Sequence, residues 1–280
     1  MQRIYSHHWS DYELIDAGDN RKLERWGEII TIRPERNAYF SPVLSNKEWK
    51  EKAHFEFIEQ TTKSGTWKTL KQNTPTEWKI NFKDCVFNLH LTKFKHIGIF
   101  PEQRTNWDFI KTNLKSGNKL LNLFAHTGGS SLIASSIGSH VNHCDSVKQI
   151  ITWAKQNMES SNLSNIHWVL DDALKFAQRE MKRGNKYDGI IMDPPAYGIG
   201  AKKERWIIES KFPELVEVSS HLLNENGFLI INTYSPKLNE EQILKTAKKY
   251  FPTKKIEINK LCIKSTSGKV IEYGELTKVH

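Results

Sequence analysis

Cysteine is scarce in this chain, and the few cysteines are not spaced like metal ligands. Only three are present, Cys85, Cys144 and Cys262, and none belongs to a Cys-x-x-Cys pair. An odd number of unclustered cysteines is not typical of a disulfide framework and favours reduced, buried thiols. The histidines form no His-Glu-x-x-His pattern either. We therefore expect neither a disulfide framework nor a metal site.

Long apolar runs are also missing. No segment approaches the ~18 to 20 apolar residues that a membrane helix requires. The first eight residues contain no apolar segment of the kind that directs secretion. These absences predict a cytoplasmic protein without a membrane partner. They leave the oligomeric state open between a monomer and a homodimer.

Acidic residues are fewer than basic ones. The chain of 280 residues has 41 lysines and arginines against 32 aspartates and glutamates, a formal net charge of +9. A basic surface gains affinity for nucleic acids by displacing the counterions of phosphates. The charge balance favours an RNA or other polyanionic partner, although a basic balance can also serve solubility alone.

The residue pattern changes near position 105. Before it, short apolar and aromatic runs at 27–34, 77–82 and 86–91 lie between turn residues. The second and third runs alternate between apolar and polar residues, as half-buried strands do. We therefore expect residues 1–105 to form a small, mostly β (α+β) accessory domain that recognises the substrate.

Residues 106–280 alternate between strand and helix patterns. Such alternation predicts βαβ units and an α/β fold with a Rossmann-like sheet. We expect seven strands, with the last two forming an antiparallel hairpin at one edge. The predicted strands are 119–124, 141–144, 166–170, 187–192, 227–232, 255–263 and 270–276, and the predicted helices are 130–137, 147–158, 173–183, 215–223 and 240–250.

Candidate ligand-binding residues follow the first two of these strands. In open α/β sheets, ligands bind beyond the carboxyl ends of the strands. The turn Phe124-Ala125-His126-Thr127-Gly128-Gly129 follows the first strand, and its glycines let the backbone approach a ligand closely. Asp145 follows the second strand, where a carboxylate can accept hydrogen bonds from ribose hydroxyls. A plain strand-to-helix turn, and a helix cap formed by Asp145 with Ser146, are the structural alternatives.

Acidic residues also follow the third strand. Asp171 and Asp172 end it, and a carboxylate there can accept a hydrogen bond from the amino group of adenine. Ala173 would then pack against the ring. The alternative is a helix N-cap, and one of the two aspartates is expected to serve as one. Asp172 is the preferred ligand residue.

Asp193-Pro194-Pro195-Ala196-Tyr197 ends the fourth strand and is the most specific motif in the chain. The two prolines stiffen the backbone and remove two donors. Asp193 and the neighbouring carbonyls can then accept from an amino or imino group of a base. Tyr197 can stack on a flat nucleobase. The structural alternative is an ordinary turn that ends the strand.

These residues resemble those of class I S-adenosylmethionine-dependent methyltransferases, in particular the group that includes the bacterial large-subunit rRNA cytosine-5 methyltransferase. The resemblance covers most of the chain. It is carried by segments 12–16, 23–27, 99–104, 121–129, 187–198 and 232–235.

The resemblance implies S-adenosylmethionine as the cofactor and an RNA, most often rRNA, as the substrate. It also implies that Gln103 and Arg104 lie near the cofactor, where Arg104 could pair with the methionine carboxylate. The expected catalytic residues are Asp193, Pro194 and Tyr197. The expected cofactor-binding residues are Gln103, Arg104, Phe124, His126, Thr127, Gly128, Asp145, Ser146, Asp171, Asp172, Ala173 and Asp193.

Two departures separate this chain from that group. We expect no N-terminal PUA domain of the kind that some relatives carry. Cytosine-5 methylation needs a cysteine thiolate that attacks the ring, and relatives place it in a Thr-Cys-Ser after the fifth strand. Here residues 232–235 read Asn-Thr-Tyr-Ser. We therefore expect a base nitrogen, rather than a pyrimidine carbon, to receive the methyl group.

Two alternatives stay open at this point. One is a methyltransferase for a protein side chain or a small metabolite, and the other is a catalytically silent RNA-binding assembly factor. A dinucleotide-dependent oxidoreductase is disfavoured because the first turn lacks Gly-x-Gly-x-x-Gly spacing. Trp26, Arg33 and Arg36 are candidate substrate contacts, and residues 202–205 are either a solvated loop or a phosphate clamp.

Overall fold

A computed structural model describes residues 1–6, 8–61, 64–199 and 205–280. The chain forms two compact units. The first, called here the α/β unit, comprises Met1–Ile4, Thr105–Leu261 and Gly274–His280. The second, called the β-rich unit, comprises Tyr5–Arg104 and Cys262–Tyr273. We predicted a division into 1–105 and 106–280; the chain ends divide differently, since the first residues join the α/β unit and Cys262–Tyr273 joins the β-rich unit.

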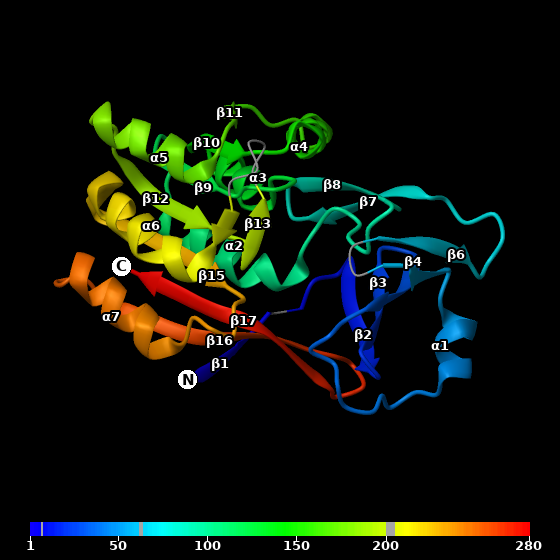
Figure 1. The fold of residues 1–280 in the computed structure, drawn as a ribbon. Coiled ribbons are helices and arrows are strands. Elements are labelled where there is room, and N and C mark those ends of the chain that lie inside the picture. The colour runs from blue at the N-terminus through cyan, green and yellow to red at the C-terminus, as the bar shows by residue number, and fades with distance from the viewer. Residues whose placement is uncertain (7, 62–63, 200–204) are drawn as a thin grey trace. The chain divides into compact units, whose positions relative to one another are not determined.

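The α/β unit is built on one sheet, with the strand order β1-β16-β17-β15-β12-β9-β10-β11 (Figure 1). Neighbours among β11, β10, β9, β12 and β15 run parallel, whereas β17 pairs antiparallel with β15. The strands are β1 (Gln2–Tyr5), β9 (Lys119–Leu123), β10 (His140–Asp145), β11 (Ile166–Leu170), β12 (Tyr187–Met192), β15 (Leu223–Thr233), β16 (Ile256–Lys264) and β17 (Val270–Val279).

The predicted α/β class and the seven expected strands are confirmed, and β17 runs antiparallel to β15. The last two strands do not form the edge as predicted, because β1 lies outside β16. The described sheet has an eighth strand, β1, and the prediction of seven is corrected in this respect. Its four residues are mostly exposed and carry no apolar run. Such a short edge strand gives no periodic signal in the sequence.

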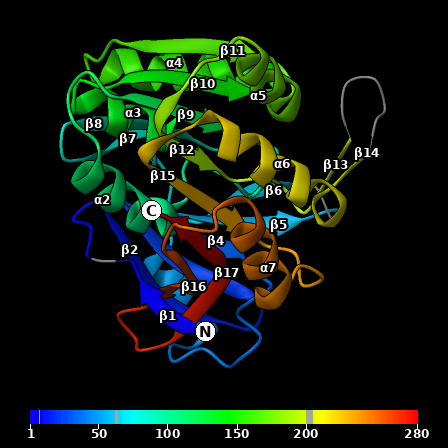
Figure 2. The ribbon, with the colours of Figure 1, turned by 90° about the vertical axis from the view of Figure 1, so that its left-hand side faces the viewer.

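Helices cover both faces of this sheet. Figure 2 shows α2, α3 and α4 on one side and α5, α6 and α7 on the other. The central strands are therefore buried on both faces, which explains why β12 reads as an apolar run rather than an alternating one. The helices are α2 (Arg104–Asn113), α3 (Gly129–Ser136), α4 (Lys148–Ser160), α5 (Ala173–Lys182), α6 (Ile208–Leu222) and α7 (Glu240–Tyr250).

Local sequence signals fix where several helices begin. Asn239 caps α7, and the side chain of Gln242 bonds back to the Asn239 backbone, which makes a capping box. Asp172 caps α5 by accepting from the Lys175 backbone N–H. The apolar faces of α5, α6 and α7 close over the sheet in a core that includes Phe176, Phe212 and Ile243.

The β-rich unit contains a five-stranded sheet with the order β2-β3-β4-β5-β6 and a separate hairpin, β7–β8. Helix α1 links β4 to β5, which run parallel. Trp49 of α1 packs with Leu23 and Ile32 of the sheet. The elements are β2 (Tyr12–Gly18), β3 (Arg21–Trp26), β4 (Ile29–Pro34), α1 (Asn46–Lys52), β5 (Phe55–Glu59), β6 (Gly65–Thr69), β7 (Glu77–Phe82), β8 (Cys85–His90) and η1 (Pro101–Gln103).

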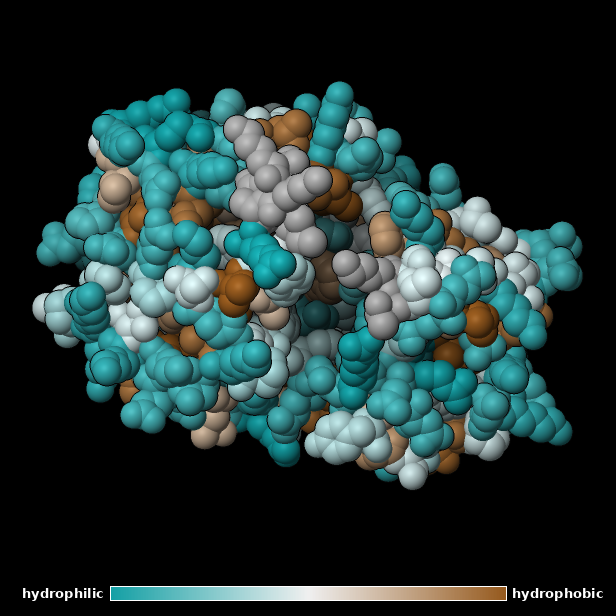
Figure 3. Space-filling view, viewed as in Figure 1, coloured by the Kyte–Doolittle hydropathy of each residue, from teal (hydrophilic) through white to brown (hydrophobic). Residues whose placement is uncertain are grey.

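The surface seen in Figure 3 is largely hydrophilic, with hydrophobic residues in small, separate patches. Among the described residues, no helix is long and apolar enough to cross a membrane.

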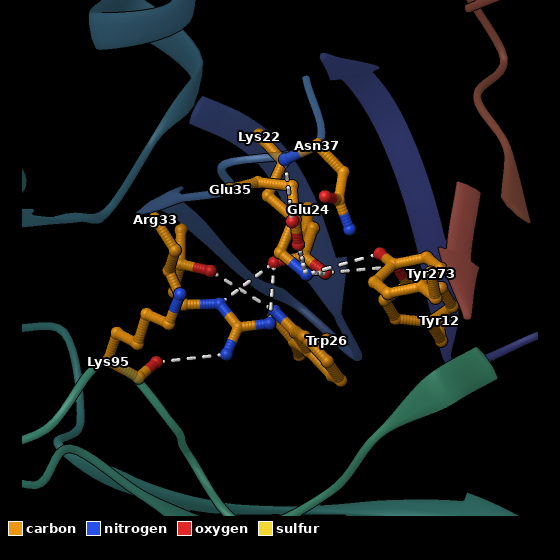
Figure 4. A network of polar contacts seen from close by, with 10 residues as sticks. Tyr12, Lys22, Glu24, Trp26, Arg33, Glu35, Asn37, Lys95 and Tyr273 are labelled. Atoms are coloured by element: carbon orange, nitrogen blue, oxygen red, sulfur yellow. Dashed lines mark hydrogen bonds and ion pairs between the residues drawn. The ribbon is translucent and has the colours of Figure 1, made fainter. Parts of the chain in front are cut away.

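A network of charged side chains is buried within the β-rich unit (Figure 4). The Arg33 guanidinium donates to the Glu24 carboxylate from Nε at 2.8 Å and from Nη2 at 2.6 Å. Lys22 and the Tyr12 hydroxyl also contact Glu24, at 3.3 Å and 3.0 Å. Burial raises the pKa of Glu24, but the charges of Arg33 and Lys22 outweigh it, so the pKa is lowered and Glu24 stays ionised.

Candidate functional site

Four neighbouring strands of the α/β unit bring the predicted residues to one edge of the sheet. In the parallel register, Leu123 of β9 lies opposite both Met192 of β12 and Cys144 of β10. The next residues along these three strands are Phe124, Asp193 and Asp145. Asp145 in turn pairs with Leu170, the last residue of β11, before Asp171. The register therefore gathers the ends of all four strands in one row.

The loop after β9 has an unusual backbone. Phe124, His126 and Gly128 have φ angles of 55°, 49° and 87°, in the left-handed region. Only glycine adopts this region without a steric cost, so Phe124 and His126 are strained. The Asn157 side chain donates to the Thr127 carbonyl at 3.0 Å and holds the loop from α4. Strain held in place by surrounding contacts is typical of functional loops.

Asp145 connects this loop to the start of α4. Its Oδ2 accepts the His126 backbone N–H at 2.9 Å, and its Oδ1 accepts the Val147 backbone N–H at 2.9 Å. Each carboxylate oxygen has two acceptor positions, so one per oxygen stays available for a ribose hydroxyl. Ser146, between Asp145 and Val147 in the sequence, is exposed. The helix α4 has Val147 as its N-cap without a side-chain bond, so the predicted alternative of a cap made by Asp145 with Ser146 is wrong.

Asp171 and Asp172 divide two structural roles between them. Asp172 caps α5 through its Oδ1, which accepts the Lys175 N–H at 2.9 Å. Asp171 accepts the Asp172 N–H at 2.7 Å and pairs with Arg179. The expectation that one of the two caps a helix is thus confirmed, and Asp172 is that residue. Ala173, the first residue of α5, is buried.

The Asp193-Pro194-Pro195 segment is held by a short hairpin that follows it. Strand β13 (Tyr197–Ile199) pairs antiparallel with β14 (Arg205–Ile207). The Trp206 indole N–H donates to the Pro195 carbonyl at 2.7 Å, and its ring lies 5.1 Å from that of Phe124. The Ala196 carbonyl accepts the Ile208 N–H at 3.2 Å. Trp206 therefore links the motif to the strained loop after β9.

The exposed face of this hairpin carries Tyr197. Its side chain is 54% exposed, and its cross-strand partner Ile207 is 41% exposed. A ring this open can stack on a planar ligand. Residues 202–205 were predicted to be a solvated loop or a phosphate clamp. Residues 202–204 lie outside the described residues, and Arg205 is exposed on β14.

Gln103 and Arg104 belong to the β-rich unit, at the end of η1 and the start of α2. Gln103 is buried. The Arg104 guanidinium lies over the Phe82 ring at 5.3 Å and donates to the His8 carbonyl. The predicted role of Arg104 at the cofactor stays a prediction.

Two residues that shape the site were not predicted. Asn157 lies on the buried face of α4 with Ile151, Trp153 and Ala154. A polar residue among the apolar residues of this face could have indicated its role from the sequence. Trp206 follows Pro195 by eleven positions, and no pattern in the sequence marks it.

The prediction that Trp26 and Arg33 contact the substrate at the surface is wrong. They are 0% and 4% exposed, because Trp26 donates to Thr31 and Arg33 pairs with Glu24 inside the β-rich unit. Arg36 is exposed, as expected.

The three cysteines are buried as free thiols. Burial raises the pKa of the Cys144 thiol, which opposes formation of a thiolate. Within the described parts of the chain, His, Cys, Asp and Glu side chains form no group of three that could hold a metal ion.

Known proteins resemble this chain in sequence and in structure. A SAM-dependent methyltransferase from Agrobacterium tumefaciens has the same fold, with a TM-score of 0.91 and 28% identity over 100% of this chain and 96% of that one. The ribosomal RNA large subunit methyltransferase K/L of Syntrophotalea carbinolica is 24% identical over 230 residues, 80% of this chain and 30% of that protein. A putative ribosomal RNA large subunit methyltransferase of Methanocaldococcus jannaschii is 26% identical over 65% of this chain and 45% of that protein.

The chain thus spans less than half the length of these two curated relatives. The predicted resemblance to S-adenosylmethionine-dependent methyltransferases is confirmed by these matches. Residues 103–261 also match a family model described as conserved hypothetical protein 95. Because that match covers more than half of the 280 residues, the chain belongs to the conserved hypothetical protein 95 family.

Proposed function

We propose that this chain is an S-adenosylmethionine-dependent methyltransferase that methylates a nitrogen of an RNA base, with rRNA as the substrate. The observation that carries the proposal is the row of four strand ends. There Asp145, Asp172 and Asp193 accompany a strained loop with a glycine turn. Acidic side chains at successive strand ends suit the polar groups of a nucleoside.

The chain's own residues fit such a cofactor. The φ of 87° at Gly128 gives the loop a left-handed backbone, and the missing Cβ lets it pack closely against Leu132 and Ala154. Asp145 would accept the ribose hydroxyls, and Asp172 would accept the adenine amino group with the oxygen that does not cap α5. Val147 and Leu170, two apolar residues that each lie two positions from one of these acids, are 44% and 55% exposed. They offer apolar surface for a flat ring.

The Asp193 segment would orient the group that is methylated. When bound, the cofactor supplies an electrophilic methyl group on a sulfonium. Asp193 and the Pro194 carbonyl would accept the N–H bonds of a base amine, which leaves the nitrogen lone pair directed at the methyl group. Trp206 keeps the Pro195 carbonyl engaged, which fixes the segment. Positioning of this kind can supply most of the rate of a transfer that needs no covalent enzyme intermediate.

The state of the thiols supports nitrogen rather than carbon as the methyl acceptor. Carbon methylation of a pyrimidine needs a thiolate nucleophile. Cys85, Cys144 and Cys262 are all buried, and burial raises the pKa of Cys144. The stretch 232–235, where relatives with that activity carry the cysteine, contains none.

An RNA substrate is supported by charge and by the relatives. The net charge of +9 suits a phosphate backbone. Two relatives are named as rRNA large subunit methyltransferases, one of them as putative. We carry this substrate over to the chain as part of the proposal.

The proposal is tested on modified nucleosides. Ribosomal RNA from cells with and without the gene is digested, and methylated nucleosides are compared by mass spectrometry. We expect one N-methylated nucleoside to disappear and to return with the wild-type gene but not with Asp193→Asn. If a C5-methylated pyrimidine disappears, the nitrogen assignment is wrong. If every rRNA methyl mark persists, the substrate is a protein, a metabolite or nothing at all.

A further inference from the structure

An exposed aromatic ring lies among basic side chains in the segment that follows β8. Thr92-Lys93-Phe94-Lys95-His96 presents Phe94 with 44% of its side chain exposed. The Lys93 ammonium lies 5.3 Å from the centre of the Phe94 ring. Single exposed hydrophobic residues are common on protein surfaces, so what distinguishes this ring is the set of basic residues around it. Alternation of basic and aromatic residues is the pattern found where nucleic-acid strands bind.

The backbone of this segment is fixed by its neighbours within the β-rich unit. The Trp67 indole N–H donates to the Thr92 carbonyl at 2.8 Å, and the Gly65 N–H donates to the Lys93 carbonyl at 3.0 Å. The Arg33 guanidinium donates to the Lys95 carbonyl at 2.9 Å (Figure 4). Arg33 is itself held by Glu24, so the buried ion-pair network positions the segment. The Phe94 ring is therefore presented by an ordered loop.

A cavity of about 460 Å³ opens beside Phe94. Arg36, Lys95 and His96 line it, together with the acid Glu59 and the ring of Phe57. Phe57 is buried and packs edge-on against Trp67, with ring centres 5.2 Å apart. The cavity thus combines an aromatic wall with cationic groups, and its volume falls in the range of small-ligand sites.

Two basic side chains, Arg36 and Lys95, line this cavity against one acid, Glu59, and this balance favours an anion. Burial lowers the pKa of the Lys95 ammonium, to which Lys22 and Arg33 also contribute, while Glu35 and Glu59 oppose the shift. A phosphate in the cavity would favour the charged form again, and Arg36 could contact the same phosphate. A planar ring with cations at its edge matches a base and its phosphate better than it matches an acidic peptide, which has no flat group to stack.

We propose that this cavity binds one nucleotide of a single-stranded RNA segment, with the base stacked on Phe94 and the phosphate between Arg36 and Lys95. The proposal rests on the proposed function, because the RNA in question is the methyltransferase substrate. A single strand is specified because a base inside a duplex cannot expose its face to a side chain.

The stacking contact is tested by RNA binding to the full chain without cofactor. The probe is a single-stranded oligoribonucleotide carrying 2-aminopurine, whose fluorescence falls when it stacks on an aromatic ring. We expect Phe94→Ala to weaken binding by about 5- to 150-fold, as loss of one stacked base does, and to abolish the fluorescence change. Phe94→Trp should restore both. Tyr39→Ala, at an 84% exposed tyrosine of the same unit that does not line the cavity, should change neither.

The phosphate contact is tested by the salt dependence of the same binding. Lys95→Gln should lower the slope of log K against log salt by about 0.7, the value for one phosphate contact on a single strand. Lys50→Gln, at an exposed lysine of α1 outside the cavity, should change the slope less. A thermal melt of each variant checks that it is folded.

Three outcomes would overturn this site. Phe94→Ala and Tyr39→Ala could bind RNA equally well, the chain could bind duplex as tightly as single strand with the same dependence on Phe94, or polyglutamate could replace RNA in the cavity. If RNA binding survives Phe94→Ala while rRNA methylation persists in cells, the proposed function stands and only the site fails. If the rRNA methyl mark is absent but single strands still bind through Phe94, the site stands and the proposed function fails.

Discussion

At the scale of single residues, the stability of the β-rich unit depends on charges removed from water. Glu24 is fully buried, and Arg33, Lys22 and Tyr12 surround its carboxylate. A buried ion pair adds little folding stability over a well-packed apolar pair. Removal of one partner, however, leaves an uncompensated buried charge, which destabilises the fold. Such a network is therefore sensitive to single substitutions.

Arg33→Met should destabilise the protein by about 3 to 5 kcal/mol, because it leaves the Glu24 carboxylate buried without its main partner. The double variant Glu24→Gln with Arg33→Met should recover part of that loss, since the charge is then gone. Urea unfolding followed by tryptophan fluorescence measures both. A loss below about 1 kcal/mol in the single variant would show that the pair is not buried as described.

Glu102 should make the stability fall as the pH rises. Burial, mainly, raises its pKa from 4.5 to about 7, so the folded state binds the proton more tightly than the unfolded state. The loss of folding stability caused by Glu102 is absent below pH 4.5, grows between about pH 4.5 and 7, and is complete above pH 7. Glu102→Gln should therefore be more stable than wild type at pH 8, by up to about 3 kcal/mol. Equal urea midpoints for the two proteins at pH 8 would refute this.

At the scale of elements, the loops at the strand ends decide what the site can do. The turn after β9 needs glycine at position 128, whereas the hairpin β13–β14 holds the Asp193 segment through Trp206. Phe124 of the turn and Trp206 of the hairpin are only partly buried where they pack against the core. We therefore expect substitutions there to affect binding or transfer more than stability.

Gly128→Ala should abolish most cofactor binding, because alanine disfavours the left-handed backbone and its Cβ would lie 3.2 Å from Leu132 and 3.3 Å from Ala154. Gly117→Ala is the matched control, since Gly117 also has a positive φ, of 82°, but meets nothing within 4 Å. Both variants should lose about 1 kcal/mol of stability. Calorimetry should show cofactor binding only for Gly117→Ala, and similar affinities for both would argue against a role for the turn.

Trp206→Phe should lower kcat by about fivefold and leave cofactor affinity unchanged. Phenylalanine keeps a ring against Phe124 but loses the 2.7 Å hydrogen bond to the Pro195 carbonyl, a contact worth about 1 kcal/mol. Trp206→Leu should weaken cofactor binding as well, because the contact with the Phe124 ring is lost. Steady-state kinetics with rRNA fragments and calorimetry separate the two effects. An unchanged kcat in Trp206→Phe would exclude a positioning role.

At the scale of the whole molecule, the sequence predicted the α/β unit well and the β-rich unit in part, since β7 and β8 lie where two strands were predicted. Parallel strands buried on both faces read as apolar runs, and β11 and β12 have the predicted bounds. The strand β3 was missed because Lys22 and Glu24 are buried as ion pairs, which breaks the alternation that marks a strand. Trp26 and Arg33 were predicted as surface contacts because they are aromatic and basic, and the sequence does not show that they are buried beside this network.

The candidate site was predictable to the extent that it follows strand order. The register brings Asp145 and Asp193 to the same edge as the glycine turn, as the order of the motifs implied. Contacts such as Trp206 with Pro195 depend on tertiary structure and leave no periodic trace in the sequence.

The central claim is that these strand ends hold S-adenosylmethionine, and calorimetry with Asp145→Asn tests it most directly. The substitution keeps the size of the side chain but removes the charge that would receive two ribose hydroxyls. Hydrogen bonds to a charged group are worth about 1.5 to 3 kcal/mol each, so we predict that wild type binds S-adenosylmethionine and that Asp145→Asn binds it at least about tenfold more weakly. No binding by wild type, or equal binding by a folded Asp145→Asn, would contradict the account.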